Sequence, residues 1–107
     1  MHLLFAHLSV HPSALTPNGD GIGDRLVVTL DLINVLEHRL LKLELFDLAG
    51  RRVRQISAQA LAGAQELVWD GRDPSGDLVP PGHYFLRLRL ESDARSQSVS
   101  RMVSIIY

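Results

Sequence analysis

Three stretches of the chain alternate apolar and polar residues with a period of two, and this pattern limits the fold more than any other feature. The stretches are residues 26–32, 41–46 and 84–90, each with leucine or valine at every second position, except for Tyr84 at the start of the third. Successive side chains of a β-strand point to opposite faces, so each stretch predicts a strand with one buried face and one solvated, charged face. The chain is therefore expected to be all-β, with antiparallel sheets.

Turn-forming residues separate these stretches. Residues 47–50 and 70–82 hold the aspartates, glycines and prolines that interrupt strands. We expect residues 33–38 to form a loop or a short helical turn, and residues 58–64 to be a connection. Four further stretches are expected to be strands: 3–10, 51–56, 65–69 and 98–106. The total of about seven strands at this spacing is typical of two stacked sheets.

Length and composition exclude several classes of function. A chain of 107 residues can bury one core and is expected to be a single domain, 1–107. Its net charge of −1, with basic and acidic residues interleaved, gives no reason to expect nucleic acid as a partner. The absence of cysteine excludes disulfides, thiolate zinc sites and cysteine nucleophiles. The apolar opening is interrupted by His7 and is too short for a membrane span, so no membrane insertion is expected.

The most specific local motif is TPNGDGIGD, from Thr16 to Asp24. Short oxygen-bearing side chains alternate with glycines, which lets the backbone curl and direct several oxygens to one hard cation. Against the EF-hand calcium loop, Asn18, Asp20 and Asp24 match the third, fifth and ninth positions, and Ile22 would offer its carbonyl at the seventh. The sequence therefore predicts Ca²⁺ as a candidate cofactor.

The same motif departs from the EF-hand loop at two positions. Thr16 replaces the first aspartate and Val27 replaces the bidentate glutamate, which weakens the site unless acids elsewhere complete it. One alternative is a metal-free turn, in which Asn18 and Asp20 accept hydrogen bonds from backbone amides and the glycines adopt positive φ. A phosphate-binding loop is the remaining alternative.

Three longer segments carry a family resemblance: LTPNGDGIGD, LKLELFDLAGRRVR and LVWDGRDPSGDLVPPGHYFLRL. Together they resemble the immunoglobulin-like domain named after the flagellar hook-capping protein. This pattern also occurs in the C-terminal sorting domains of type IX secretion and of gliding-motility proteins. The resemblance covers residues 9–107. It implies an immunoglobulin- or fibronectin III-like antiparallel β-sandwich without catalytic activity.

The residues that match the family pattern have implied architectural roles in two turns and the core. The first turn contains Asp47, Gly50 and Arg51. The second turn and its flanks contain Trp69, Asp70, Gly71, Asp73, Gly76, Pro81, Gly82 and Tyr84. Trp69 and Tyr84 are expected in or near the core, and Asp70 is expected to accept amides of the following turn. The alternative is that Trp69 and Tyr84 form a platform on which sugars stack.

The resemblance also implies a function: a non-catalytic C-terminal module of a larger exported bacterial protein that serves as a sorting, anchoring or spacer domain. The expected location is extracellular or at the cell surface, and the expected partner is the secretion machinery or a cell-surface protein. One alternative is a structural assembly module of the hook-capping type. The other is a carbohydrate-binding accessory module of a secreted hydrolase. The sequence shows no nucleophile elbow, and its five histidines do not have the spacing of metal ligands. Neither feature therefore favours an enzyme.

Overall fold

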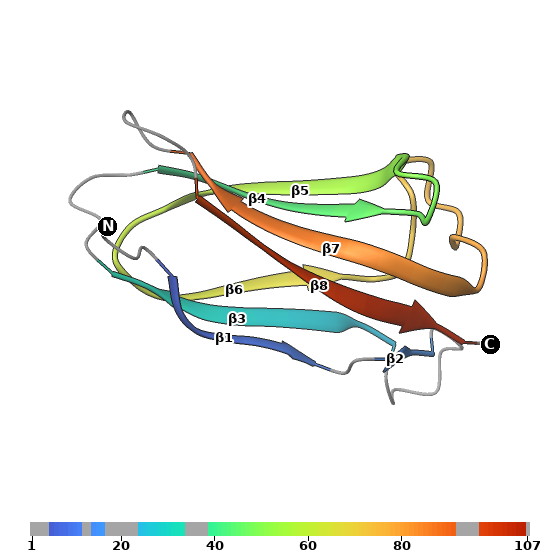
Figure 1. Cartoon of the computed structure of the whole chain (residues 1–107), viewed down its shortest axis with the longest axis horizontal. Helices are drawn as coiled ribbons and strands as arrows, with labels where there is room; N and C mark the ends of the chain where they lie inside the picture. Colours follow the sequence, from blue (N-terminus) through green and yellow to red (C-terminus); the bar gives the residue numbers. More distant parts are fainter. Residues whose placement is uncertain (1–4, 12–13, 17–23, 34–38, 92–96, 107) are drawn as a thin grey trace.

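The computed structural model describes residues 5–11, 14–16, 24–33, 39–91 and 97–106, and within these ranges every regular element is a β-strand. Two sheets stack face to face (Figure 1), which confirms the expected all-β sandwich. No helix among the described residues is long and apolar enough to span a membrane. The eight strands are β1 (Phe5–His11), β2 (Ala14–Leu15), β3 (Leu26–Leu32), β4 (Arg39–Phe46), β5 (Arg52–Ala60), β6 (Gly63–Trp69), β7 (Gly82–Leu90) and β8 (Gln97–Ile105).

The smaller sheet has the strand order β1-β3-β6, and the larger has the order β2-β8-β7-β4-β5. The long strands pair antiparallel, as expected from the sequence. The short strand β2 is different because it runs parallel to β8, with Ala14 opposite Ser104 and Leu15 opposite Ile105. Strand β8 consequently lies inside its sheet, between β2 and β7. Strands β1 and β8, which lie near the two ends of the chain, are thus both paired within the sandwich.

The core lies between the two sheets and is built from the apolar face of each alternating stretch. On β3, β4 and β7 every second residue is buried, so that Val28, Leu43 and Leu88 are completely inaccessible to solvent. Removing a leucine or valine side chain from water stabilises the fold by about 1.5–3 kcal/mol. The largest fully buried side chain is that of Trp69, at the end of β6.

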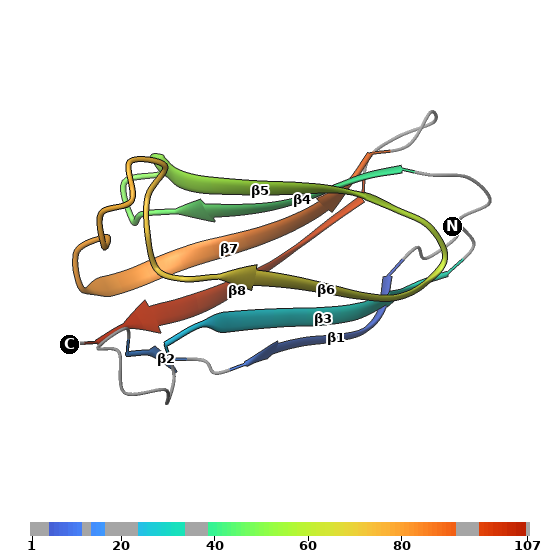
Figure 2. The same cartoon turned by 180° about the vertical axis from the view of Figure 1, so that it is seen from behind.

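The expectation of a connection at residues 58–64 is wrong. Strand β5 continues to Ala60 and β6 begins at Gly63, so the chain crosses from one sheet to the other within two residues, 61 and 62. Figure 2 shows this crossing where β5 leads into β6. Ala60 is buried and Ala58 packs against the core, but small side chains give a weak alternating signal. In the region expected to be a loop or helical turn, Ile33 follows β3 and residues 34–38 lie outside the described ranges.

Candidate functional site

The turn between β4 and β5 is organised by the side chain of Asp47. Its Oδ1 accepts hydrogen bonds from the backbone amides of Ala49 (3.0 Å) and Arg51 (2.9 Å), and its Oδ2 lies 3.0 Å from the Nε of Arg51. Gly50 has a φ of 85°, a conformation that glycine adopts without strain. The amide of Arg51 first, and then its guanidinium, hold the pKa of Asp47 below its usual value of 3.8. The carboxylate is thus engaged by its own turn.

The longer connection between β6 and β7 uses two further aspartates in the same way. Asp70 Oδ1 accepts the amide of Arg72 at 3.0 Å, so it binds the following turn. Asp73 Oδ1 accepts the amides of Ser75 (2.9 Å) and Asp77 (3.1 Å).

Three glycines in and after this connection have positive φ: Gly71 (80°), Gly76 (90°) and Gly82 (144°). The Gly71 carbonyl accepts the amide of Val79 at 2.9 Å, which closes the loop upon itself. The Gly76 amide donates to the carbonyl of Asp73 at 3.0 Å. The aspartates of this connection therefore form hydrogen bonds with backbone amides of the same loop.

Trp69 and Tyr84 lie in the core and contact each other edge to face. Their ring centroids are 6.3 Å apart at an interplanar angle of 66°, and the two residues are 1% and 4% exposed. The indole Nε1 donates to the carbonyl of Arg72 at 3.0 Å, and the tyrosine hydroxyl donates to the carbonyl of Pro80. Rings this deeply buried cannot present a stacking surface to a sugar, so these two residues form no carbohydrate platform.

The structure brings several of the motif residues from the two turns to one open groove of about 510 Å³ at an end of the sandwich. Leu48 and Val53 contribute branched apolar side chains to its wall. Its remaining lining consists of Asp47, Arg51, Arg52, Pro80, Pro81, Gly82, His83 and Tyr84. The sequence placed these residues in separate turns, and only the packing of β4, β5 and β7 makes them neighbours. Trp69, Asp70, Gly71 and Asp73 do not line the groove.

The predicted calcium ligands Asn18, Asp20 and Ile22 lie outside the described residues. Asp24 lies two residues before the start of β3 and is partly exposed. In the part of the chain that the structure describes, no group of three or more histidine or acidic side chains could hold a metal ion. The calcium site therefore stays a prediction from the sequence.

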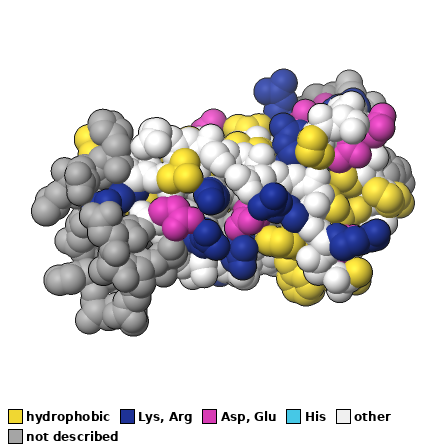
Figure 3. Space-filling view, turned by 90° about the horizontal axis from the view of Figure 1, so that it is seen from above, with side chains coloured by type: hydrophobic (Ala, Val, Ile, Leu, Met, Phe, Trp, Pro, Cys, Tyr) yellow, Lys and Arg dark blue, Asp and Glu magenta, His cyan; other side chains and the backbone are white. Residues whose placement is uncertain are grey.

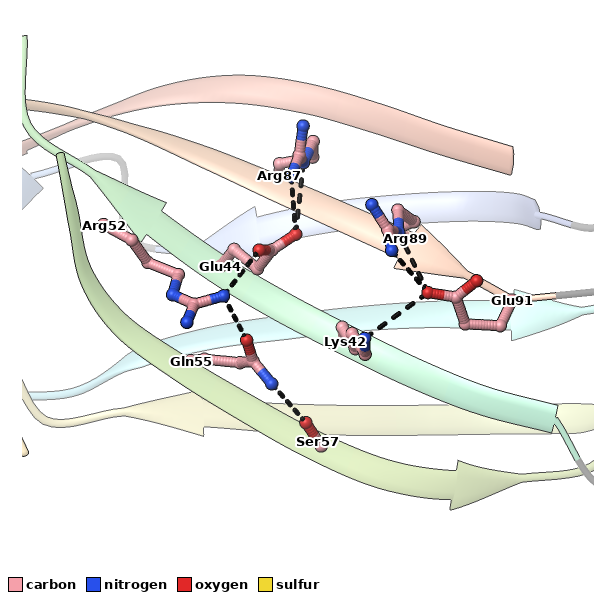
Figure 4. Close-up of polar contacts among 8 residues, drawn as sticks. All are labelled: Lys42, Glu44, Arg52, Gln55, Ser57, Arg87, Arg89 and Glu91. Atoms are coloured by element: carbon pink, nitrogen blue, oxygen red, sulfur yellow. Dashed lines mark hydrogen bonds and ion pairs between the residues drawn. The ribbon is translucent and has the colours of Figure 1, made fainter. Parts of the chain in front are cut away.

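A ladder of charged side chains covers the outer face of the larger sheet, as Figure 4 shows. The charged ladder consists of Lys42, Glu44, Arg52, Arg87, Arg89 and Glu91. Arg87 donates to Glu44 Oε1 from Nε (3.1 Å) and from Nη2 (2.9 Å), and Arg52 Nη1 lies 3.4 Å from Glu44 Oε2. Further along β4 and β7, where Lys42 lies opposite Arg89, Glu91 Oε1 lies 3.4 Å from Lys42 Nζ and accepts a hydrogen bond from Arg89 Nε at 3.1 Å.

The sequence predicted solvated charges on the outer faces of the strands, and for Glu44 this is wrong. Its side chain is only 6% exposed because two arginines cover it. Burial by itself raises the pKa of Glu44, but the hydrogen bonds and charge of Arg87, together with Arg52 and Arg89, outweigh it and lower the pKa from 4.5. The signal that could have identified the contact is the matching alternation of charges along β4 and β7, which the register aligns at Glu44 and Arg87.

An apolar strip lies beside the charged ladder on the same face. It consists of Phe46, Phe85 and Met102, which the strand register places side by side on β4, β7 and β8. Phe85 is 40% and Met102 is 55% exposed. Figure 3 looks onto this face, where hydrophobic side chains lie next to a group of basic and acidic ones.

Comparison with known proteins identifies relatives of this fold. The profile of the CHU_C type IX secretion signal domain matches residues 9–105, and no curated protein sequence matches the chain. Among solved structures, dimeric latent PorU from Porphyromonas gingivalis superposes with a TM-score of 0.75 at 13% identity, covering 92% of this chain and 9% of that one. FlgD from P. aeruginosa gives 0.60 at 26% identity, covering 76% and 62%.

A third solved structure is PorZ, described as an essential bacterial surface component of the type IX secretion system of P. gingivalis. It superposes with a TM-score of 0.55 at 21% identity, covering 94% of this chain and 11% of that one. The chain thus spans only a small part of PorU and PorZ and less than two thirds of FlgD. Because the family profile extends over nearly the whole sequence, the chain belongs to the CHU_C family of type IX secretion signal domains.

Proposed function

We propose that this chain is the sorting module of a larger exported bacterial protein and that the type IX secretion machinery recognises it in the folded state. The observation that carries the proposal is the match of a type IX secretion signal domain to residues 9–105. A signal of this kind sends its protein to the cell surface or the extracellular space. The module is non-catalytic and occupies the C-terminal part of its parent protein.

The use of the motif residues supports a non-catalytic role. The carboxylates of Asp47, Asp70 and Asp73 accept hydrogen bonds from backbone amides of their own turns. Their role in the fold is therefore to stabilise these turns. Trp69 and Tyr84 are buried, with their polar atoms bonded to carbonyls. A general acid or base must be available to exchange a proton with a substrate, and these groups are already engaged in hydrogen bonds with the protein backbone.

Attachment to a larger protein is supported by the solved structures. PorU and PorZ are long chains in which this fold accounts for 9% and 11% of the length. A module of this size is therefore compatible with attachment to a much larger partner domain in the same polypeptide.

Calcium binding belongs to the proposal on the strength of the sequence. The loop that contains Asn18, Asp20 and Asp24 supplies the oxygen-rich, glycine-spaced pattern that Ca²⁺ prefers. In an extracellular medium with millimolar calcium, such a site stabilises the folded module.

A second candidate is an assembly module of the hook-capping type, which the likeness to FlgD at 26% identity supports. In that role an exposed sheet edge would pair with a neighbouring subunit. The edge strand β5 offers the longest such surface of the larger sheet, from Arg52 to Ala60.

The sorting function can be tested by fusing residues 1–107 behind a reporter that carries a signal for export to the periplasm. The fusion is expressed in a bacterium with an active type IX system and in an isogenic strain that lacks the system. We expect the reporter in the medium or at the cell surface only in the first strain, while a reporter without the module stays in the periplasm of both. Equal distribution of the fusion in the two strains would contradict the proposal.

A further inference from the structure

The outer face of the larger sheet carries an apolar strip and a charged ladder side by side. The strip of Phe46, Phe85 and Met102 crosses three adjacent strands at one level. Two residue pairs further along the strands, on the same face, Glu44 lies opposite Arg87, and the ladder begins. The side chains of Phe85 and Met102 are 40% and 55% exposed on this face, and their contact with water costs solvation free energy unless a partner covers them.

Arg87 connects the strip to the ladder. Its guanidinium carbon lies 5.1 Å from the centroid of the Phe46 ring, and its nitrogens donate to Glu44. A side chain that is held on two sides loses little conformational entropy when a partner binds. The centre of the face is therefore preorganised in the free protein.

The composition of the face is that of the centre of a protein interface. Phenylalanine, methionine and arginine are enriched in such centres, and a few of them usually carry most of the binding energy. Four cationic side chains stand against two carboxylates in the ladder, which gives it a net charge of +2, whereas the chain as a whole has a net charge of −1. A partner with carboxylates around an apolar centre complements this pattern. The same face of a second copy would repel it.

We propose that the outer face of the larger sheet docks an acidic protein surface with an apolar centre, with Phe85 and Met102 as the anchoring side chains. The inference deepens the proposed function and rests on it for the identity of the partner, which is a component of the secretion machinery. The docking chemistry itself depends only on the side chains of this face.

The first test measures the docking chemistry without any cellular machinery. The ¹⁵N-labelled chain is titrated with three short synthetic peptides of equal length that alternate glutamate with leucine, glutamate with serine, or lysine with leucine. We expect amide shifts on β4, β7 and β8 with the glutamate–leucine peptide, and binding about tenfold weaker or more for the double variant Phe85→Glu/Met102→Glu. Shifts centred on the smaller sheet, an equal response to the lysine–leucine peptide, or no response to any peptide overturn the proposal.

The second test uses export of the reporter fusion described above. We expect Phe85→Glu/Met102→Glu to lower type IX-dependent export at least tenfold, while Val68→Glu leaves it unchanged. Val68 is the matched control because it is an apolar strand residue, 37% exposed, on the smaller sheet. Thermal unfolding of both variants checks that they remain folded.

The outcomes separate the two proposals. If the wild-type fusion is not exported, the sorting function fails, and the peptide titration alone decides whether the face docks acidic surfaces. If the wild-type fusion and the double variant are exported equally, sorting stands and this face is not its recognition surface. Concentration-dependent dimerisation that the double variant abolishes would assign the face to a second copy of the chain and overturn the proposed partner.

Discussion

Replacing Glu44 with glutamine is expected to destabilise the protein at neutral pH. The Glu44 carboxylate is 6% exposed as a side chain and accepts hydrogen bonds from Arg87 at 3.1 and 2.9 Å. Arg52 lies 3.4 Å from its second oxygen. Glutamine has nearly the same shape, but it carries no charge and its amide group points a donor at one of the two arginines.

The expected loss in the free energy of unfolding is about 1.5 kcal/mol. A hydrogen bond to a charged group contributes roughly 1.5–3 kcal/mol, and breaking a deeply buried ion pair costs about 3–5 kcal/mol. The lower end applies here because the side chains of Arg87 and Arg52 are 38% and 54% exposed, so water can hydrate them in the variant. For a domain of this size, the melting temperature should fall by about 6–12 °C.

The difference should depend on pH in one direction. The pKa of Glu44 in the folded protein lies below its ordinary value of 4.5, since the arginines outweigh the effect of burial. A carboxylate with a depressed pKa stabilises the fold above its unfolded pKa, and this contribution is lost as the pH falls through the folded pKa. The wild type should therefore exceed Glu44→Gln in stability at pH 7, and the gap should shrink below pH 4.5.

Urea unfolding followed by circular dichroism at pH 7 and at pH 3 measures this gap. Glu66→Gln is the control, because Glu66 is an exposed glutamate on β6 and its replacement should change stability by less than about 0.5 kcal/mol. The reasoning is refuted if Glu44→Gln behaves like Glu66→Gln at pH 7, or if its deficit is the same at both pH values.

Three further predictions concern the core, a turn and the calcium loop. Trp69→Phe should destabilise the protein by about 2 kcal/mol in urea unfolding, because it removes buried ring area and the hydrogen bond from Nε1. Gly50→Ala should cost about 1 kcal/mol in the same assay because φ is 85°, with a smaller loss for Gly50→Asn; equal losses would contradict this. Millimolar Ca²⁺ should raise the melting temperature relative to EDTA, by an amount equivalent to about 2.7 kcal/mol at a hundredfold excess over the dissociation constant. Asp20→Asn should abolish that shift. Identical melting temperatures of the wild type in Ca²⁺ and in EDTA would show that the loop is a metal-free turn.

The inward faces of the long strands could be predicted from the sequence because the alternation of apolar and polar residues within each strand shows which of its faces is buried. Leu43, Leu86 and Leu88 recur at every second position and are completely buried. Nothing outside the strand is needed for this inference, since the alternation follows from the pleat of the backbone.

The length of β5 and the existence of β2 could not be predicted, for two physical reasons. The second half of β5 uses Ala58 and Ala60, whose small side chains reach the core without a strong hydrophobic signal. Strand β2 has two residues and exists only through its pairing with β8, whose residues lie about ninety positions later in the chain.

The candidate interaction surface could likewise not be predicted from the sequence. Glu44 belongs to an alternating strand and looks solvated, and its burial depends on arginines that β5 and β7 bring from elsewhere. The groove has the same origin, because the turns around Asp47 and Pro81 are individually recognisable but border one space only after the strands pair. Local patterns identify turns, whereas shared surfaces require the register.

The parallel pairing of β2 with β8 has a consequence for the order in which the molecule can be completed. The amide of Ile106 donates to the carbonyl of Leu15 at 2.9 Å, and Val103 and Ile105 fill the core beside Tyr84. A nascent chain that ends before β8 therefore lacks the strand that lies between β2 and β7, and β2 has no pairing partner in its sheet. The native pairing of both sheets therefore becomes accessible to a nascent chain only after residue 106 has been synthesised.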